Sequence, residues 1–162
     1  MKRLCCLAIV IFLCACSLYG CSDNTKVYER KGLSLNLPAY FEDKSSESYA
    51  EDYTFLYTYG GTGFLGICEN RSDFPAGYEN MALEAYGKFV ILGNGLSCDL
   101  QKKDGFYTFS YEKDAPEGKL TYVAIVLESK DAFWTVQGYC LSSFYEENAA
   151  FLWETLKSAK LH

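Results

Sequence analysis

The residue types that most often carry catalysis are scarce in this chain. Its single histidine, His162, is the last of the 162 residues, so no imidazole is expected beside a serine or cysteine nucleophile in a cleft. Of the eight cysteines, Cys68, Cys98 and Cys140 lie beyond residue 21, and none of these three belongs to a C-x-x-C pair of a redox or zinc site. We predict no catalytic residues and no metal site. We expect these three thiols to be buried and inert, with one disulfide as the alternative.

A glycine pattern and an acidic run are the other candidate sites. Residues 61–66 have the G-x-G-x-x-G spacing of dinucleotide-binding loops. That loop must open a helix, whereas residues 64–69 read as a strand, so we interpret the motif as a hairpin turn and predict no cofactor. Carboxylates between residues 42 and 52 could bind calcium, but they lack a D-x-D-x-D-G loop and we expect a solvated acidic segment. They are Glu42, Asp43, Glu47, Glu51 and Asp52.

The overall charge narrows the range of partners. The chain has a formal net charge of −6 and a pI of about 4.8, which removes the main electrostatic attraction to a phosphate backbone. We therefore predict no nucleic-acid partner. Hydrophobic residues make up 49% of the chain and charged residues 22%, as in a folded globular protein, and the length suits one domain.

The first 20 residues have the composition of an export signal. Lys2 and Arg3 precede an uncharged run over residues 4–19, which is shorter than the ~20 apolar residues of a membrane-spanning helix. The run ends in Leu18-Tyr19-Gly20-Cys21, which resembles the lipobox of bacterial lipoproteins. The resemblance implies that a signal peptidase recognises Leu18 and Gly20 and cuts before Cys21. The thiol of Cys21 would then carry a diacylglyceryl group with acyl chains such as palmitate.

Two alternatives to this processing remain open. Leu13-Cys14-Ala15-Cys16 has the same form, which would make Cys16 the lipid site, and the apolar run could instead stay in place as an uncleaved anchor. With Cys21 as the lipid site, the domains are a signal peptide at 1–20, a lipidated cysteine and short linker at 21–26, and one domain at 27–162. We expect the protein to be exported and anchored to the outer face of the cell membrane, or to the outer membrane if the cell has two membranes. A linker of five residues spans at most ~17 Å, so the domain would lie close to the membrane.

Hydrophobic periodicity predicts strands, a helix, further strands and a final helix. Alternating apolar residues predict strands at 33–37 and 53–59, and the segment 64–69 after a glycine turn completes a hairpin with the second. Further strands, separated by turn signals, are predicted at 96–101, 106–112, 120–129 and 132–141. A stripe at helical spacing from Tyr78 to Phe89 predicts the first helix, and Gly93-Asn94-Gly95 ends it. Ser143 and Glu146 have the spacing of a capping box, and the apolar stripe of the last helix runs from Ala149 to Ala159.

These elements predict an α+β fold. Short hairpin connections favour a mostly antiparallel sheet, and two amphipathic helices must each cover part of it. We therefore expect an α/β/α sandwich.

Three segments resemble the PsbP-like domains of small bacterial lipoproteins. They are the opening stretch at 28–38, the aromatic late strand at 132–137, and the last helix, which carries Trp153. The resemblance covers residues 26–161. It implies the same α/β/α sandwich and a role as a binding or assembly subunit rather than a catalyst.

Aromatic residues are the compositional feature that bears on function, since they make up 17% of the chain. Tyr107 and Tyr111 share one strand face, as do Tyr57 and Tyr59, and an exposed tyrosine row would suit a protein or glycan partner. Packing in the core is the alternative for these rings.

We predict a non-catalytic binding or scaffold domain whose partners are the membrane, through its lipid anchor, and an envelope protein. The alternatives are a carboxylate-based enzyme acting on envelope glycan and a small-ligand or metal binder.

Overall fold

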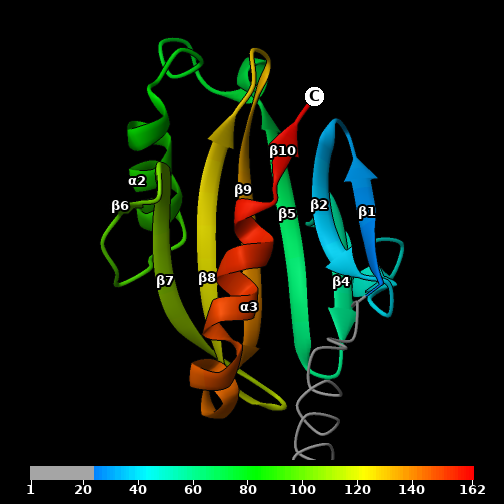
Figure 1. Cartoon of the computed structure of the whole chain (residues 1–162). Coiled ribbons are helices and arrows are strands. Elements are labelled where there is room, and N and C mark those ends of the chain that lie inside the picture. Colours follow the sequence, from blue (N-terminus) through cyan, green and yellow to red (C-terminus); the bar gives the residue numbers. More distant parts are fainter. Residues whose placement is uncertain (1–23) are drawn as a thin grey trace, which may run out of the picture.

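Two antiparallel sheets and two α-helices make up the described part of the chain (Figure 1). The computed structural model describes residues 24–162. Its strands are β1 (Thr25–Arg30), β2 (Leu33–Pro38), β3 (Glu42–Asp43), β4 (Phe55–Tyr59), β5 (Thr62–Asn70), β6 (Gln101–Lys103), β7 (Phe106–Ala115), β8 (Gly118–Glu128), β9 (Ala132–Leu141) and β10 (Lys160–Leu161). Its helices are α2 (Leu83–Gly93) and α3 (Tyr145–Lys157), with short 3₁₀ turns η2 (Ser48–Ala50), η3 (Arg71–Asp73) and η4 (Ser142–Phe144).

The larger sheet has seven strands in the order β3-β4-β5-β9-β8-β7-β6, and each neighbouring pair is antiparallel. Tight hairpins join β4 to β5, β7 to β8 and β8 to β9, as short connections between antiparallel strands allow. The pairing of β5 with β9 is the long-range step. It brings residues 63–70 beside residues 132–139.

The smaller sheet has three strands in the order β1-β2-β10. It joins the start of the described chain to its end, because β2 pairs with β1 on one side and with β10 on the other. The backbone N–H of His162 donates to the carbonyl of Gly32 at 2.9 Å, and the ring Nε2 of His162 lies 2.8 Å from the Ser34 hydroxyl. The histidine is thus part of the small sheet's closure.

Alternation along the central strands sends one set of side chains to each face of the large sheet. Ile125 and Trp134 enter the core beneath α3 and the small sheet, whereas Ala124 and Phe133 enter a second core beneath α2. Figure 1 shows α3 crossing in front of β8 and β9. This arrangement confirms the predicted α+β fold with an antiparallel sheet and two helices.

The small sheet and β1 were not predicted. β1 starts at Thr25, two residues inside the segment interpreted as linker. Residues 96–100 form no strand, and pairing starts only at Gln101. In place of pairing, Leu100 packs its side chain against Gly87 of α2, so this segment follows the helix rather than the sheet.

Both helix starts also differ from the prediction. α2 begins at Leu83 rather than Tyr78, because Tyr78 and Met81 each close a backbone turn onto the residue three positions earlier. The predicted capping box is absent: Phe144 is the N-cap of α3, and no side chain bonds at that position. The turn η4 precedes it, and the Ser142 hydroxyl lies 2.8 Å from that of Thr121.

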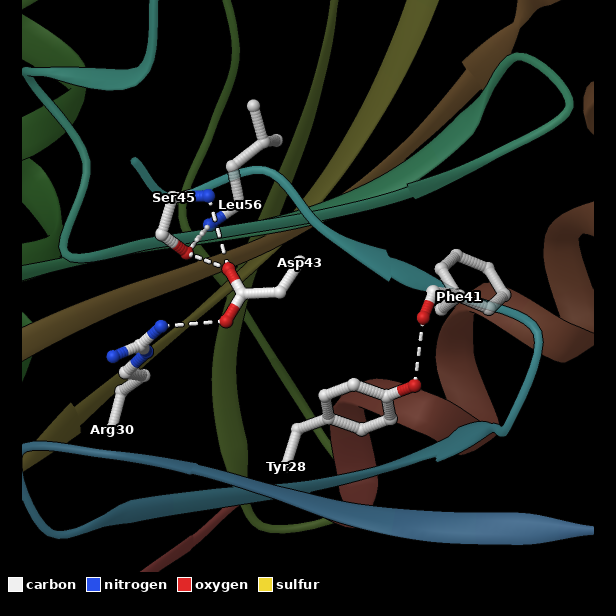
Figure 2. A network of polar contacts seen from close by, with 6 residues as sticks. All are labelled: Tyr28, Arg30, Phe41, Asp43, Ser45 and Leu56. Atoms are coloured by element: carbon white, nitrogen blue, oxygen red, sulfur yellow. Dashed lines mark hydrogen bonds and ion pairs between the residues drawn. The ribbon is translucent and has the colours of Figure 1, made fainter. Parts of the chain in front are cut away.

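A polar network holds the small sheet against the large one (Figure 2). Arg30 forms an ion pair of 2.6 Å with Asp43, and Asp43 also accepts hydrogen bonds from the hydroxyl and backbone N–H of Ser45. The Tyr28 hydroxyl donates to the carbonyl of Phe41 at 2.7 Å. Because these bonds start on β1 and end at or beside β3, they fix the position of the first strand on the domain.

Among residues 24–162, no helix is long and apolar enough to span a bilayer.

Candidate functional site

The face of the large sheet that carries α2 is only partly covered by that helix. α2 closes one half through Tyr86 and Ile91, which pack with Phe109 and Phe133. In the other half, a small cluster of Ala50, Leu56 and Leu65 is bordered by half-buried tyrosines. This half is the candidate site.

Three tyrosines cross this half of the sheet from strand to strand. Tyr111 on β7 is paired in register with Tyr122 on β8, and Tyr122 is paired with Tyr139 on β9. The rings of Tyr111 and Tyr122 stack at 4.8 Å between centroids with an angle of 2°, and those of Tyr122 and Tyr139 lie 5.3 Å apart. We call Tyr111, Tyr122 and Tyr139 the tyrosine ladder. Cross-strand aromatic pairs of this kind stabilise a sheet and present a continuous aromatic surface.

A glycine on the next strand makes room for the last ring of the ladder. Gly63 on β5 lies opposite Tyr139 in the register, and a Cβ at that position would overlap with the phenol ring. The glycine motif at 61–66 therefore has a structural meaning. Gly61 turns the β4–β5 hairpin with a φ of +83°, Gly63 accommodates Tyr139, and Gly66 accommodates Phe55. This confirms the hairpin interpretation.

The phenols of the ladder are hydrogen-bond donors at neutral pH. Burial raises the pKa of Tyr111 and of Tyr122, and it raises the pKa of Tyr139 to about 12. The Tyr111 hydroxyl donates to the side-chain carbonyl of Gln137 at 2.7 Å. The ladder thus combines apolar ring faces with neutral polar groups, which is a combination common in protein interfaces.

Two grooves adjoin along the ladder. The larger groove has a volume of about 620 Å³ and reaches α2, and the smaller one has about 410 Å³ and reaches the β4–β5 turn. Tyr111 lines the first and Tyr122 the second, and these two rings stack on each other. The larger groove is lined by Ile67, Glu69, Phe89, Val90, Gly93, Asn94, Leu96, Phe109, Tyr111, Glu112, Lys113, Thr135 and Gln137. The smaller is lined by Tyr49, Tyr53, Leu56, Thr58, Gly61, Leu65, Glu117, Leu120, Tyr122, Tyr139 and Leu141.

The four tyrosines predicted as a partner surface do not form one surface. Tyr111 belongs to the ladder. Tyr107 is half-buried, with its hydroxyl 3.4 Å from the Glu84 carboxylate of α2. Tyr59 is 54% exposed but lies at the end of β4, where its ring packs beside that of Tyr40. Tyr57 is only 2% exposed, so its assignment to a surface is corrected: the small sheet covers β4, and the Tyr28 ring packs on Tyr57.

The cysteines and the acidic segment, the remaining candidates, show no arrangement for catalysis or metal binding in the described part of the chain. Cys68, Cys98 and Cys140 are free thiols, but only Cys140 is buried as expected, whereas Cys68 and Cys98 are half-buried. Burial raises the pKa of each, which disfavours the nucleophilic thiolate. In the acidic segment, Asp43 pairs with Arg30 and Glu42 with Lys44. Within residues 24–162, no group of three or more histidine, cysteine or acidic side chains is arranged to hold a metal ion. Leu18, Gly20, Cys21 and the alternative Cys16 lie outside the described residues.

Beneath α2, a polar contact sits inside the second core. The Tyr86 hydroxyl donates to the Glu69 carboxylate at 2.6 Å and lies 3.0 Å from the Thr135 hydroxyl. Tyr86 is fully buried, and burial and the neighbouring carboxylate raise its pKa well above the usual range. This contact anchors α2 on the sheet and bounds the larger groove at Glu69.

Comparison with known proteins gives the fold but no family. No family model matches the chain, and no curated protein sequence matches it significantly. Among solved structures, it is similar to the solution structure of cyanobacterial PsbP (CyanoP) from Synechocystis sp. PCC 6803, with a TM-score of 0.58, 11% sequence identity, and coverage of 90% of this chain and 96% of that one. It is also similar to a point mutant of the protein Mog1, with a TM-score of 0.50, 11% identity, and coverage of 85% and 96%. The chain therefore has a PsbP-like fold.

Proposed function

We propose that this chain is an exported lipoprotein, anchored through Cys21, whose PsbP-like domain is a non-catalytic module that binds an envelope protein through the tyrosine ladder. The observation that carries the proposal is the ladder on the half of the sheet face that neither α2 nor α3 covers. A tyrosine buries a large area on binding while losing few rotamers, and its hydroxyl keeps the free surface compatible with water. An aromatic row between two grooves is therefore suited to a protein segment.

The lipidated anchor is supported by the sequence before the domain. The Leu18-to-Cys21 motif ends only three residues before Asn24, the first described residue, and β1 begins at Thr25. Cleavage before Cys21 would remove the apolar run and leave the whole domain intact.

The anchor is tested on protein extracted from membranes. We expect the N-terminal peptide to start at Cys21 with a mass that includes a diacylglyceryl group, and we expect Cys21→Ser to leave the signal peptide uncleaved. Lipid on Cys16 would move the site, and an unmodified chain that begins at Met1 in the soluble fraction would refute the anchor. Cys16→Ser is the matched control and is expected to be processed normally.

The binding surface is tested by photo-crosslinking in intact cells. A photoreactive phenylalanine replaces Phe89, which lines the larger groove, or Leu92, which is on the same helix and is not among the groove's lining residues. We expect a discrete protein adduct from position 89 and none from position 92, and we expect Tyr122→Ala to abolish it. Equal labelling from both positions, or an adduct that survives Tyr122→Ala, would contradict this use of the groove.

One observation favours an alternative function. Two carboxylates, Glu69 and Glu112, line the larger groove, and a carboxylate pair is the minimal set for hydrolysis of a glycan. Both are already engaged, since Glu69 accepts from Tyr86 and Glu112 pairs with Lys119 at 3.2 Å. Release of fragments from purified envelope glycan, lost in both Glu69→Gln and Glu112→Gln, would favour the enzyme over the binding module.

A further inference from the structure

Exposed aromatic side chains gather at the end of the domain where the chain enters. Tyr40 is 51% exposed, Tyr59 54% and Phe144 51%. All three line one shallow hollow of about 360 Å³. They come from three separate segments: Tyr40 follows β2, Tyr59 ends β4, and Phe144 precedes α3. Figure 1 shows the start of β1, the β4–β5 turn and the start of α3 toward the same end of the molecule. We call Tyr40, Tyr59 and Phe144 the aromatic end.

The first described residue lies directly beside this aromatic end. The backbone N–H of Ala39 donates to the carbonyl of Asn24 at 2.7 Å, which places Asn24 next to the residue that precedes Tyr40. The Tyr40 ring in turn lies 4.4 Å from the Tyr59 ring. Cys21 is three residues before Asn24 and so lies within about 11 Å of it even when the chain is fully extended.

The strand that follows the proposed anchor is held firmly on the domain. β1 pairs with β2 along its whole length. The Arg30–Asp43 ion pair and the Tyr28–Phe41 hydrogen bond tie β1 to the segment that leads into the large sheet (Figure 2). Since the described chain begins beside the aromatic end, an anchor at Cys21 would bring the bilayer to this end of the domain.

The aromatic end also lacks the charge that would keep an acidic domain away from lipid. The chain as a whole has a net charge of −6, and anionic headgroups would repel it. None of the residues that line the hollow is charged. Glu146 and Glu147 follow on α3 and are exposed, so a contact here stays at headgroup depth, where carboxylates remain hydrated.

We propose that the aromatic end is a membrane-contacting surface, with Tyr40, Tyr59 and Phe144 seated at the interface of the bilayer that carries the anchor. Tyrosine is enriched at that depth in membrane proteins, because its ring is apolar and its hydroxyl remains in water. The contact would orient the domain on the membrane, with the smaller groove of the ladder next to it, since Gly61 and Leu141 line both hollows. This inference rests on the proposed lipid anchor.

The test uses the full chain, extracted with its lipid and reconstituted in phosphatidylcholine vesicles with or without brominated acyl chains. Tyr59→Trp places a fluorescent probe at the aromatic end. Tyr78→Trp is the matched control, because Tyr78 has the same exposure of 54% but follows the opposite end of β5. We expect the added emission of Tyr59→Trp to shift to shorter wavelength and to be quenched by brominated lipid. That of Tyr78→Trp should keep the wavelength of a water-exposed indole and should not be quenched.

The other outcomes each overturn the inference in a distinguishable way. If the protein floats with the vesicles but Tyr59→Trp is not quenched, the anchor stands and the membrane contact is wrong. If the protein does not float, the lipid anchor fails and the inference fails with it. A shift that is equal in both kinds of vesicle and grows with the protein-to-lipid ratio would mean that a second copy covers the aromatic end. Phe144→Trp repeats the test from another segment, in case Tyr59→Trp disturbs the hairpin.

Discussion

At the scale of single residues, Asp43 connects the two sheets through one carboxylate. Its partial burial raises the pKa, but the hydrogen bonds from Ser45 and the ion pair with Arg30 lower it more, so the pKa lies below the usual value. A lowered pKa in the folded state contributes stability above the unfolded value of about 4, and that stability is lost as the pH falls through the folded pKa.

We therefore predict that Asp43→Asn lowers the free energy of unfolding at pH 7 and flattens its decline in acid. The loss should be about 1–2 kcal/mol, the range for charge-assisted hydrogen bonds reduced by solvent exposure. Urea unfolding of both proteins at pH 7 and pH 3 measures it. Glu42→Gln is the control, because Glu42 pairs with Lys44 on the surface. A loss for Asp43→Asn that is equal at both pH values would contradict the electrostatic origin.

Tyr139 makes stability depend on pH in alkali, as Asp43 does in acid. Burial raises its pKa to about 12, so its contribution to stability is complete below the unfolded value of about 10 and is lost as the pH rises toward 12. We predict that the free energy of unfolding of the wild type falls between pH 10 and 12, and falls less in Tyr139→Phe by about 1–2 kcal/mol. Denaturant unfolding across this range, with phenolate absorbance as the second signal, provides the measurement. A phenolate difference between the two proteins that appears near pH 10 would contradict the burial of this ring.

At the scale of elements, the β4–β5 hairpin contains two glycines of one motif that make room for two different aromatic rings. A Cβ at Gly66 would overlap with the Phe55 ring, which is fully buried, whereas a Cβ at Gly63 would overlap with the outer end of the half-exposed Tyr139. The first ring has no free space to move into. The second can swing away from the sheet.

We predict that Gly66→Ala destabilises the fold by about 2–3 kcal/mol, as overpacking of a core does, and that Gly63→Ala costs less than about 1 kcal/mol. Gly63→Ala should instead displace Tyr139 from the ladder and weaken the photo-crosslink from position 89. Thermal unfolding and crosslinking are measured on the same pair of variants. Equal destabilisation by both substitutions would mean that the Tyr139 ring is held as firmly as the Phe55 ring.

The elements also show what the sequence could predict. The sequence predicted the strands β2, β4, β8 and β9, and the short hairpins implied an antiparallel sheet. The turns at 114–118 and 130–131 could further have placed Tyr122 opposite Tyr111 and Tyr139, since the register of a hairpin follows from its turn. Sequence reasoning missed Tyr122 and Tyr139 because it considered tyrosines along one strand rather than across strands.

The burial of Tyr57 and the strand β10 depend on long-range contacts, which the hydrophobic periodicity of the sequence does not reveal. Tyr57 was assigned to a surface together with Tyr59, but it is buried because β1 and β2 form a second layer over β4, where the Tyr28 ring packs on it. One edge of that layer is β10, a strand of two residues at the far end of the chain. Such a short strand has too few residues to show alternation.

At the scale of the whole molecule, β10 is the link that closes the small sheet around both ends of the chain. Lys160 and Leu161 pair with Ser34 and Leu33, and the His162 backbone N–H donates to the carbonyl of Gly32. Without these residues one edge of β2 would be open to water, and β2 is the strand on which β1 pairs. The large sheet makes no use of β10.

We predict that deletion of residues 160–162 loosens the small sheet and leaves the large sheet intact. Amide hydrogen exchange should become faster, by about tenfold or more for a loss of ~1.4 kcal/mol in local stability, at β1 and β2 but not at β8 and β9. His162→Ala is the matched control, because it removes the ring contact with Ser34 while keeping the backbone bond. If exchange quickened equally in both sheets, the domain would open as one cooperative unit. The orientation of the aromatic end would then depend on global stability rather than on the closure of the small sheet.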